Sequence, residues 1–208
     1  MHQFTSDIAF TSSVKAVQTE NGSRGSYAKM EQTRGFETQV TPRLESFLAE
    51  MDMFYLGTSN AEGQPYIQYR GGPTGFLRAV DQKTLAFADF GGNQQFITVG
   101  TLSENQKAFI FLMDYANSRR IKICGTARVV ENDPDLLVSL SDPEYPASPE
   151  RAILFTIEAW DVNCPQHIHK RVLVSEVAPE IERLENEVAE LKARLKGVES
   201  GSAAIVLE

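Results

Sequence analysis

The chain has 208 residues, of which 42% are hydrophobic and 23% charged, the ordinary balance of a globular protein. Its formal net charge of −8 argues against a general nucleic-acid-binding protein, because such a protein presents a basic face to phosphates. It has no apolar stretch near the roughly 20 residues that cross a bilayer, no secretory signal at its start, and too few cysteines for a disulfide framework. These features predict a cytoplasmic protein that binds neither membrane nor nucleic acid.

Residues 1–40 form a polar segment rich in Thr, Ser, Gly and charge. We expect this N-terminal arm either to pack on the following domain or to extend freely, and it contains one helix candidate over residues 12–20. A second helix is expected to begin at Thr41, as its N-cap, and Pro42, as its first residue. Its apolar face carries Leu44, Phe47, Leu48 and Met51.

Short strands follow, separated by turn residues. Alternating or dense apolar residues predict strands over 53–59, 65–70, 107–114, 119–130 and 151–162, and a further strand carries Leu85, Phe87 and Asp89. Asp133 and Pro134 begin a short helix that ends at Leu140. Several short strands with a few helices indicate a mainly β, α+β protein built on an antiparallel barrel rather than on a parallel sheet.

The C-terminal segment differs in kind from the rest of the chain. Its apolar residues alternate at spacings of three and four, which is typical of a coiled-coil seam: Ile181, Leu184, Val188, Leu191 and Leu195. This seam must pack against another surface. That surface can belong to a partner subunit or to the chain's own barrel. We therefore divide the chain into an arm (1–40), a barrel (41–175), a heptad helix (176–197) and a flexible tail (198–208).

Two polar turns leave neighbouring strands within residues 66–114. Gln68 and Arg70 share one face of the first strand, whereas Tyr69 points the other way and is expected in the core. The second turn follows Asp89 and begins a helix, with Asn93 as its expected N-cap. Unpaired backbone N–H groups and an arginine near such a helix start predict an anion site, most plausibly for a phosphate.

Four segments in order, EGQPYIQYRGGPTGFLR, TLAFADFGGNQQFITVGTLSEN, RRIKICGTARVV and EAWDVNCPQHI, carry a family resemblance. With them the sequence resembles the flavin mononucleotide (FMN)-binding split-barrel proteins related to pyridoxamine 5'-phosphate oxidase, over about residues 4–171. The resemblance implies an antiparallel FMN-binding split β-barrel. It also implies a homodimer that holds FMN at the subunit interface.

The resemblance also implies the contact residues. Gln68 and Arg70 lie near the phosphate and ribityl chain, and Arg120 or Lys122 near the flavin pyrimidine edge, where a cation would stabilise charge that develops on reduction. A solvated strand face explains these two cations equally well, and packing explains Phe90 equally well. The predicted cofactor contacts are Gln68, Arg70, Asp89, Phe90, Asn93, Gln94, Gln95, Arg120, Lys122, Trp160, Asn163 and His167.

Other site chemistries have less support. Cys164, His167 and His169 are metal-ligand types, but no second cluster of His or Cys accompanies them, so we predict no metal. A nucleophilic Cys164 has only His167 as a nearby base. The sequence lacks the Walker, GxGxxG, GxSxG and HExxH motifs, which removes the main support for kinases, dinucleotide-fold dehydrogenases, hydrolases and zinc proteases.

The functional expectation is an FMN-dependent oxidoreductase that moves a hydride or electrons to or from a small molecule. Oxidation of pyridoxamine 5'-phosphate itself is less expected, because the chain ends in an acidic heptad helix where the family's larger oxidases carry a basic segment. The alternatives are a flavin carrier or sensor without turnover, a heme-binding split barrel, and a flavin-free interaction module that acts through its C-terminal helix.

Overall fold

The structure is a computed structural model that describes the backbone of residues 3–205 and the side chains of residues 3–196. It comprises two compact units; the first runs to residue 167 without residues 115–117, which belong with residues from 168 on to the second. The elements are η1 (Thr5–Ile8), α1 (Ser12–Glu20), α2 (Arg24–Thr33), α3 (Pro42–Ala49), β1 (Met53–Ser59), β2 (Pro65–Gly71), β3 (Arg78–Ala79), β4 (Thr84–Phe90), α4 (Ile97–Glu104), β5 (Lys107–Asp114), β6 (Arg119–Val130), α5 (Pro134–Leu140), β7 (Pro149–Val162) and α6 (Val174–Ile205).

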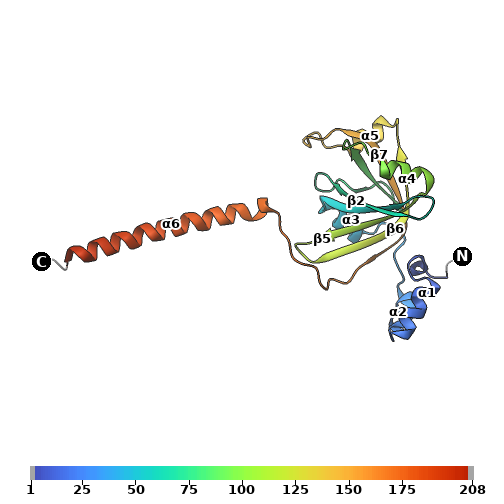
Figure 1. Cartoon of the computed structure of the whole chain (residues 1–208), viewed down its shortest axis with the longest axis horizontal. Coiled ribbons are helices and arrows are strands. Elements are labelled where there is room, and N and C mark those ends of the chain that lie inside the picture. The colour runs from blue at the N-terminus through green and yellow to red at the C-terminus, as the bar shows by residue number, and fades with distance from the viewer. Residues whose placement is uncertain (1–2, 206–208) are drawn as a thin grey trace. The chain divides into compact units, whose positions relative to one another are not determined.

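All seven strands form one curved antiparallel sheet in the order β2-β1-β5-β6-β7-β4-β3 (Figure 1). Neighbours in the chain, such as β1 and β2 or β5 and β6, pair as hairpins, while β7 joins β6 to β4. The longest ladder joins β6 and β7 and runs from Ile121 opposite Val162 to Val130 opposite Ala152. The predicted split barrel with a C-terminal helix is therefore the observed fold.

The inner face of the sheet encloses the main hydrophobic core. Alternate residues of β1 and β5 are buried, because successive side chains of a strand point to opposite faces. Helix α3 closes this core, and its N-cap is the predicted one: the Thr41 hydroxyl accepts a hydrogen bond from the Leu44 N–H at 3.3 Å. Its predicted apolar residues Leu44, Phe47, Leu48 and Met51 are all buried.

The N-terminal arm packs on β6 and β7. Glu37 pairs with Trp160 as an isolated antiparallel bridge, and Arg34 forms an ion pair of 2.9 Å with Asp161. Phe36 is buried, with the Lys122 ammonium 4.9 Å from the centre of its ring. Helix α1 has the predicted bounds, whereas α2 was not predicted, because its sequence RGSYAKMEQT has little apolar periodicity.

Two local predictions were wrong. Asn93 does not cap α4, because the helix begins four residues later at Ile97 and its N-cap is Phe96, with left-handed backbone angles. Tyr69 is 59% exposed rather than in the core, because β2 is an edge strand and no element of the barrel covers its outer face. The alternation of β2 is therefore real, but its apolar residues face outwards.

Helix α6 belongs to the second unit and is a continuous helix with Pro179 near its start. Its backbone continues past residue 197 to Ile205, so most of the predicted tail is helical here, and residues 206–208 lie outside the described range. Among the described residues, no helix is both long enough and apolar enough to cross a membrane.

The β6–β7 ladder contains an irregularity that requires glycine. The register shifts between Cys124 and Gly125, and a Cβ atom at Gly125 would lie 2.0 Å from the Thr156 carbonyl oxygen and 2.7 Å from the Phe155 ring. Both obstacles belong to the buried ladder, so the backbone itself must move to admit a side chain.

We therefore expect Gly125→Ala to lower the free energy of unfolding by about 2–3 kcal/mol, measured by urea denaturation. Gly100→Ala in α4 is the matched control, because a Cβ there meets nothing within 4 Å. That variant should be stabilised by about 0.5–1 kcal/mol. Equal midpoints for the two variants would contradict the assigned strain.

Candidate anion-binding site

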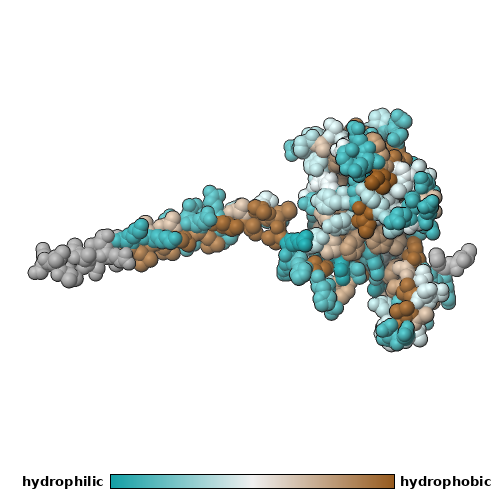
Figure 2. Space-filling model, viewed as in Figure 1, coloured by the Kyte–Doolittle hydropathy of each residue, from teal (hydrophilic) through white to brown (hydrophobic). Residues whose placement is uncertain are grey.

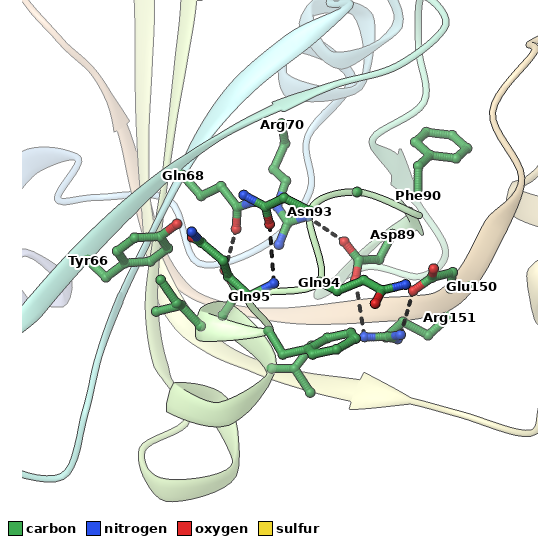
Figure 3. A pocket seen from close by; sticks show the side chains of 15 residues that line it. Tyr66, Gln68, Arg70, Asp89, Phe90, Asn93, Gln94, Gln95, Glu150 and Arg151 are labelled. Carbon is green, nitrogen blue, oxygen red and sulfur yellow. Dashed lines mark hydrogen bonds and ion pairs between the residues drawn. The ribbon is translucent and has the colours of Figure 1, made fainter.

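A shallow hollow lies between the edge strand β2, the end of β4, the loop that leads into α4, and the start of β7 (Figure 3). The sheet order explains this meeting, because β4 pairs with β7 and so brings Asp89 opposite Arg151. Seven of the predicted contact residues line the hollow together: Gln68, Arg70, Asp89, Phe90, Asn93, Gln94 and Gln95.

Asp89 lies between two arginines. One of its carboxylate oxygens accepts a hydrogen bond from Arg70, and the other is 3.8 Å from an Nη atom of Arg151 (Figure 3). Asp89 is 7% exposed, so its charge requires these partners. Arg151 also donates to Glu150 at 2.6 Å, and its guanidinium lies 5.2 Å from the centre of the Phe96 ring.

Arg70 has an unused donor at this site. Its Nε is buried and makes no hydrogen bond, and among the described residues it is the one buried side-chain nitrogen or oxygen atom of which this is true. A buried N–H without an acceptor costs free energy, and such orphans commonly mark the place of an unseen acceptor. The remaining capacity of this guanidinium therefore favours an oxygen-rich anion beside Arg70.

The loop before α4 has an unusual backbone. Gln94 and Phe96 have φ angles of 59° and 51°, in the left-handed region that costs non-glycine residues free energy. The Asn93 side chain accepts a hydrogen bond from the Gln95 N–H at 3.2 Å, which shapes this turn instead of capping the helix. Because no side chain caps α4, the N–H groups of its first turn are available to an anion.

The edge strand is fixed to the helix by a polar contact. The Thr98 hydroxyl donates to the Gln68 side-chain oxygen at 2.6 Å, so the Gln68 amide nitrogen remains as a donor towards the hollow. Tyr66 lies two residues earlier on the same face of β2 and also lines the hollow. The walls thus supply two guanidinium groups, amide donors and a helix start.

The hollow is small. Its cavity volume is about 60 Å³, whereas sites for small molecules and cofactors usually enclose about 300–1,000 Å³. This volume suits a phosphate-sized group rather than a whole dinucleotide or flavin. A larger ligand held here must extend beyond the surface of one chain.

The other five predicted contacts do not line this hollow. Trp160 is buried in the core and its indole N–H donates to the Gln39 carbonyl at 2.7 Å, Lys122 covers Phe36, and His167 is exposed. Arg120 donates through Nε to the Cys164 carbonyl at 2.7 Å, and it lines a second hollow with Asn163. The cofactor role of all five stays a prediction.

The second hollow has a volume of about 320 Å³ and walls that include Phe47, Val162 and Pro165. It lies at the opposite end of the β6–β7 ladder from Arg151, because Arg120 is near the start of β6 while Arg151 is near the start of the antiparallel β7. Nine residue steps along such a ladder measure about 30 Å. A single ligand therefore does not contact both hollows of one chain.

Sequence reasoning missed several lining residues, of which Arg151 matters most. Arg151 is the first residue of the predicted strand 151–162 and follows Glu150, a position that any surface charge can occupy. Its role depends on the pairing of β7 with β4. A pairing register is not visible in local sequence. The left-handed Phe96 was likewise missed, although GGNQQF contains the glycines and amides typical of an irregular turn.

The structure gives little support for a metal site or for a nucleophilic cysteine. Among the described side chains of residues 3–196, no three His, Cys, Asp or Glu side chains gather to hold a metal ion. Cys124 is half-buried, and burial raises the pKa of its thiol, which keeps it protonated and weakly reactive. Cys164 is exposed, and its backbone N–H donates to the Asn163 side chain.

Removing Asp89 tests the electrostatic arrangement. We expect Asp89→Ala to lower the free energy of unfolding by about 3–5 kcal/mol, because two largely buried guanidinium groups lose their shared carboxylate. Inorganic phosphate should then raise the melting temperature of this variant more than that of the native protein, because the anion replaces the carboxylate.

Glu62→Ala is the control, since Glu62 is exposed in the β1–β2 turn. It should change neither stability nor the response to phosphate. An Asp89→Ala variant that phosphate stabilises no more than the native protein would contradict an anion site here.

Comparison with known proteins shows the family to which this chain belongs. Residues 40–164 match the family model described as pyridoxamine 5'-phosphate oxidase. Comparison with curated proteins gives no match.

Among solved structures, the chain is similar to HupZ of Group A Streptococcus (18% identity, TM-score 0.49, 64% of this chain and 99% of that chain). It is also similar to a protein of Clostridium acetobutylicum related to general stress protein 26 (18% identity, TM-score 0.40, 64% of this chain and 98% of that chain). A third similar structure is that of an FMN-binding protein from Syntrophomonas wolfei (12% identity, TM-score 0.43, 70% of this chain and 97% of that chain). Because the family model matches more than half of its length, this chain belongs to the pyridoxamine 5'-phosphate oxidase family.

Proposed function

We propose that the chain binds FMN, with the phosphate in the hollow beside Arg70, and acts as an oxidoreductase of the pyridoxamine 5'-phosphate oxidase-like class. The observation that carries the proposal is the buried Arg70 Nε without an acceptor, in a hollow that Arg151 and the uncapped start of α4 also line. Membership in the family supports the choice of a flavin. When bound, the flavin supplies hydride or electron transfer.

The chain's own residues recognise the phosphate. Arg70 and Arg151 provide charge-assisted hydrogen bonds, which are roughly twice as strong as neutral ones. Gln68 and the first backbone N–H groups of α4 add neutral donors, as is usual where a helix start meets a phosphate. Asp89 and Glu150 offset part of the positive charge, so binding depends on geometry as much as on net charge.

The flavin ring requires a second chain in this proposal. The hollow accommodates only a phosphate-sized group, and the predicted ring contacts Arg120 and Asn163 lie about 30 Å away along the β6–β7 ladder. In a homodimer, the far end of the partner's ladder contacts the ring while this chain holds the phosphate. Lys122, Trp160 and His167 stay predicted contacts of that second surface.

An exposed apolar face supports the homodimer. Ile67 and Tyr69 of β2 are 68% and 59% exposed, and Phe109 lies on the same outer face of the sheet, two strands away. Tyr55 joins them, with its ring 6.1 Å from that of Tyr69. Contiguous apolar side chains on a sheet face are typical of a protein interface. Only the edge strand β2 separates this face from the phosphate hollow, because Gln68 and Arg70 project from the other side of the same strand.

A flavin carrier or sensor would use the same hollow without turnover, and a heme-binding barrel would not need a phosphate site. Visible absorption of the purified protein, before and after addition of FMN and gel filtration, separates flavin from heme. Oxidation of a reduced nicotinamide under steady-state conditions then separates an enzyme from a carrier. The small-molecule substrate and the cytoplasmic location stay predictions from the sequence.

Arg70→Ala should weaken FMN binding by about 1.5–3 kcal/mol, or roughly 10- to 150-fold, as measured by fluorescence titration. Arg151→Ala should act in the same direction. Neither variant should weaken the binding of riboflavin, which has the ring and the ribityl chain but no phosphate.

Arg128→Ala is the matched control, because it removes an exposed guanidinium from β6 outside the hollow. Unchanged FMN affinity in Arg70→Ala, or equal losses for FMN and riboflavin, would contradict the phosphate assignment.

Tyr69→Asp combined with Phe109→Asp should weaken the dimer and abolish stable FMN binding. Both changes place charges on the exposed apolar face, which a dimer would bury. Light scattering measures the mass, and the titration measures the flavin.

Val138→Asp is the control, since Val138 is equally apolar and 75% exposed but lies on α5. A double variant that keeps both the dimer affinity and the FMN affinity of the native protein would rule out this face as the interface.

A further inference from the structure

Helix α6 carries an apolar stripe that nothing in its own unit covers. The members of the stripe are between 45% and 62% exposed, and they are Ile181, Leu184, Val188, Leu191 and Leu195. Figure 2 shows hydrophobic residues along one side of the helix and hydrophilic residues along the other. An amphipathic helix gains stability chiefly by burying such a face, so the stripe needs an occupant.

The residue types of the stripe indicate one other helix as that occupant. In heptad positions, Ile181, Val188 and Leu195 are at a, and Leu184 and Leu191 are at d. An apolar stripe confined to the a and d positions is the narrow seam of a coiled coil, in which one helix packs against another. A broad apolar groove would instead favour a wider apolar face on the helix.

The charges along the helix are unevenly distributed, and their distribution distinguishes a parallel copy of the helix from an antiparallel one. From Glu176 to Glu190 the chain has six glutamates and one arginine, whereas Lys192, Arg194 and Lys196 follow without any acid. A parallel copy would set acidic half against acidic half. A copy that runs in the opposite direction sets each acidic half against a basic half, and it also opposes the two helix dipoles favourably.

We propose that α6 pairs in antiparallel orientation with α6 of a second copy of this chain. In the central layers, Leu184 packs against the partner subunit's Leu195, and Val188 packs against the partner subunit's Leu191. The two-fold symmetry of a homodimer repeats each layer. This contact is separate from the sheet face assigned above, so either can fail without the other.

The same register pairs the flanking charges. Glu185 faces the partner's Lys192 at the e positions, and Glu187 faces the partner's Arg194 at the g positions, with no pair of like charges among them. In a parallel pair, Glu180 would face the partner's Glu185, which is a repulsive contact, while Glu187 would face the partner's Lys192, which is an attractive one. The e and g charges of this helix therefore favour the antiparallel arrangement.

These charged groups are available for a partner. Among the side chains that the structure describes, Glu185, Lys192 and Arg194 form no ion pair. Glu187 is 3.2 Å from Arg183, but both side chains are more than half exposed, so that pair is weak and readily exchanged.

Disulfide trapping in the full chain tests the orientation. In a Cys164→Ser background, Leu184→Cys and Leu195→Cys are introduced singly and together, and mild oxidation is followed by non-reducing electrophoresis. The antiparallel pair predicts a covalent dimer for the double variant and at least tenfold less for either single variant. The background protein, which retains Cys124, is the blank.

The matched control is Asn186→Cys with Ala193→Cys, which occupies the outer f positions of the same helix and should not form the covalent dimer. Cross-linking of Leu184→Cys alone would show a parallel pair and overturn the proposal. Absence of any cross-linked dimer, whether the protein is monomeric or is a dimer held by the sheet face alone, would overturn it as well.

Charge exchange tests the register independently. In the double-cysteine protein, Lys192→Glu with Arg194→Glu should reduce the yield of covalent dimer at least fivefold, because every flanking pair becomes acidic. Adding Glu185→Lys and Glu187→Lys should restore it, since the pairs are then reversed but complementary. Failure of this restoration would overturn the assigned register.

Discussion

The ladder between β6 and β7 is the constraint on which the rest of the barrel depends. It is the longest pairing in the sheet, it links β5 on one side to β4 on the other, and the N-terminal arm packs on it. Because its strands are antiparallel, the start of β7 and the start of β6 lie at opposite ends. The ladder therefore places Arg151 in one hollow and Arg120 in another, about 30 Å apart.

The phosphate hollow is held together by opposite charges before any ligand is present. Asp89 satisfies Arg70 and Arg151 in part, and this keeps two guanidinium groups at a largely buried position that they would otherwise avoid. A ligand phosphate must share these arginines with a carboxylate. Because the arginines are shared, the affinity for the phosphate is lower than two unpaired arginines would give. The Nε of Arg70 and the start of α4 still provide directed hydrogen-bond donors.

The two surfaces that we propose for contacts with a second copy differ physically. The outer face of β1, β2 and β5 is broad, aromatic and next to the phosphate hollow, so its burial would complete a ligand site. The stripe of α6 is narrow and flanked by charges, so its burial would fix orientation more than it adds area. Two modest contacts between the same two chains reinforce each other through effective concentration.

The sequence by itself determined the features that follow from local rules. The strand alternation, the Thr41 cap of α3 and the seam of α6 depend on residues within one or two turns of each other, and all are observed. The family segments also predicted the split barrel and seven of the residues that line one hollow.

Only the tertiary structure decided what depends on strand pairing. Tyr69 faces outwards because β2 is an edge strand, and Arg151 joins the hollow because β7 pairs with β4; neither fact is encoded near those residues. Asn93 fails as a cap because left-handed residues delay the start of α4. Local sequence fixes which face of an element is apolar, whereas the register of distant strands fixes what that face meets.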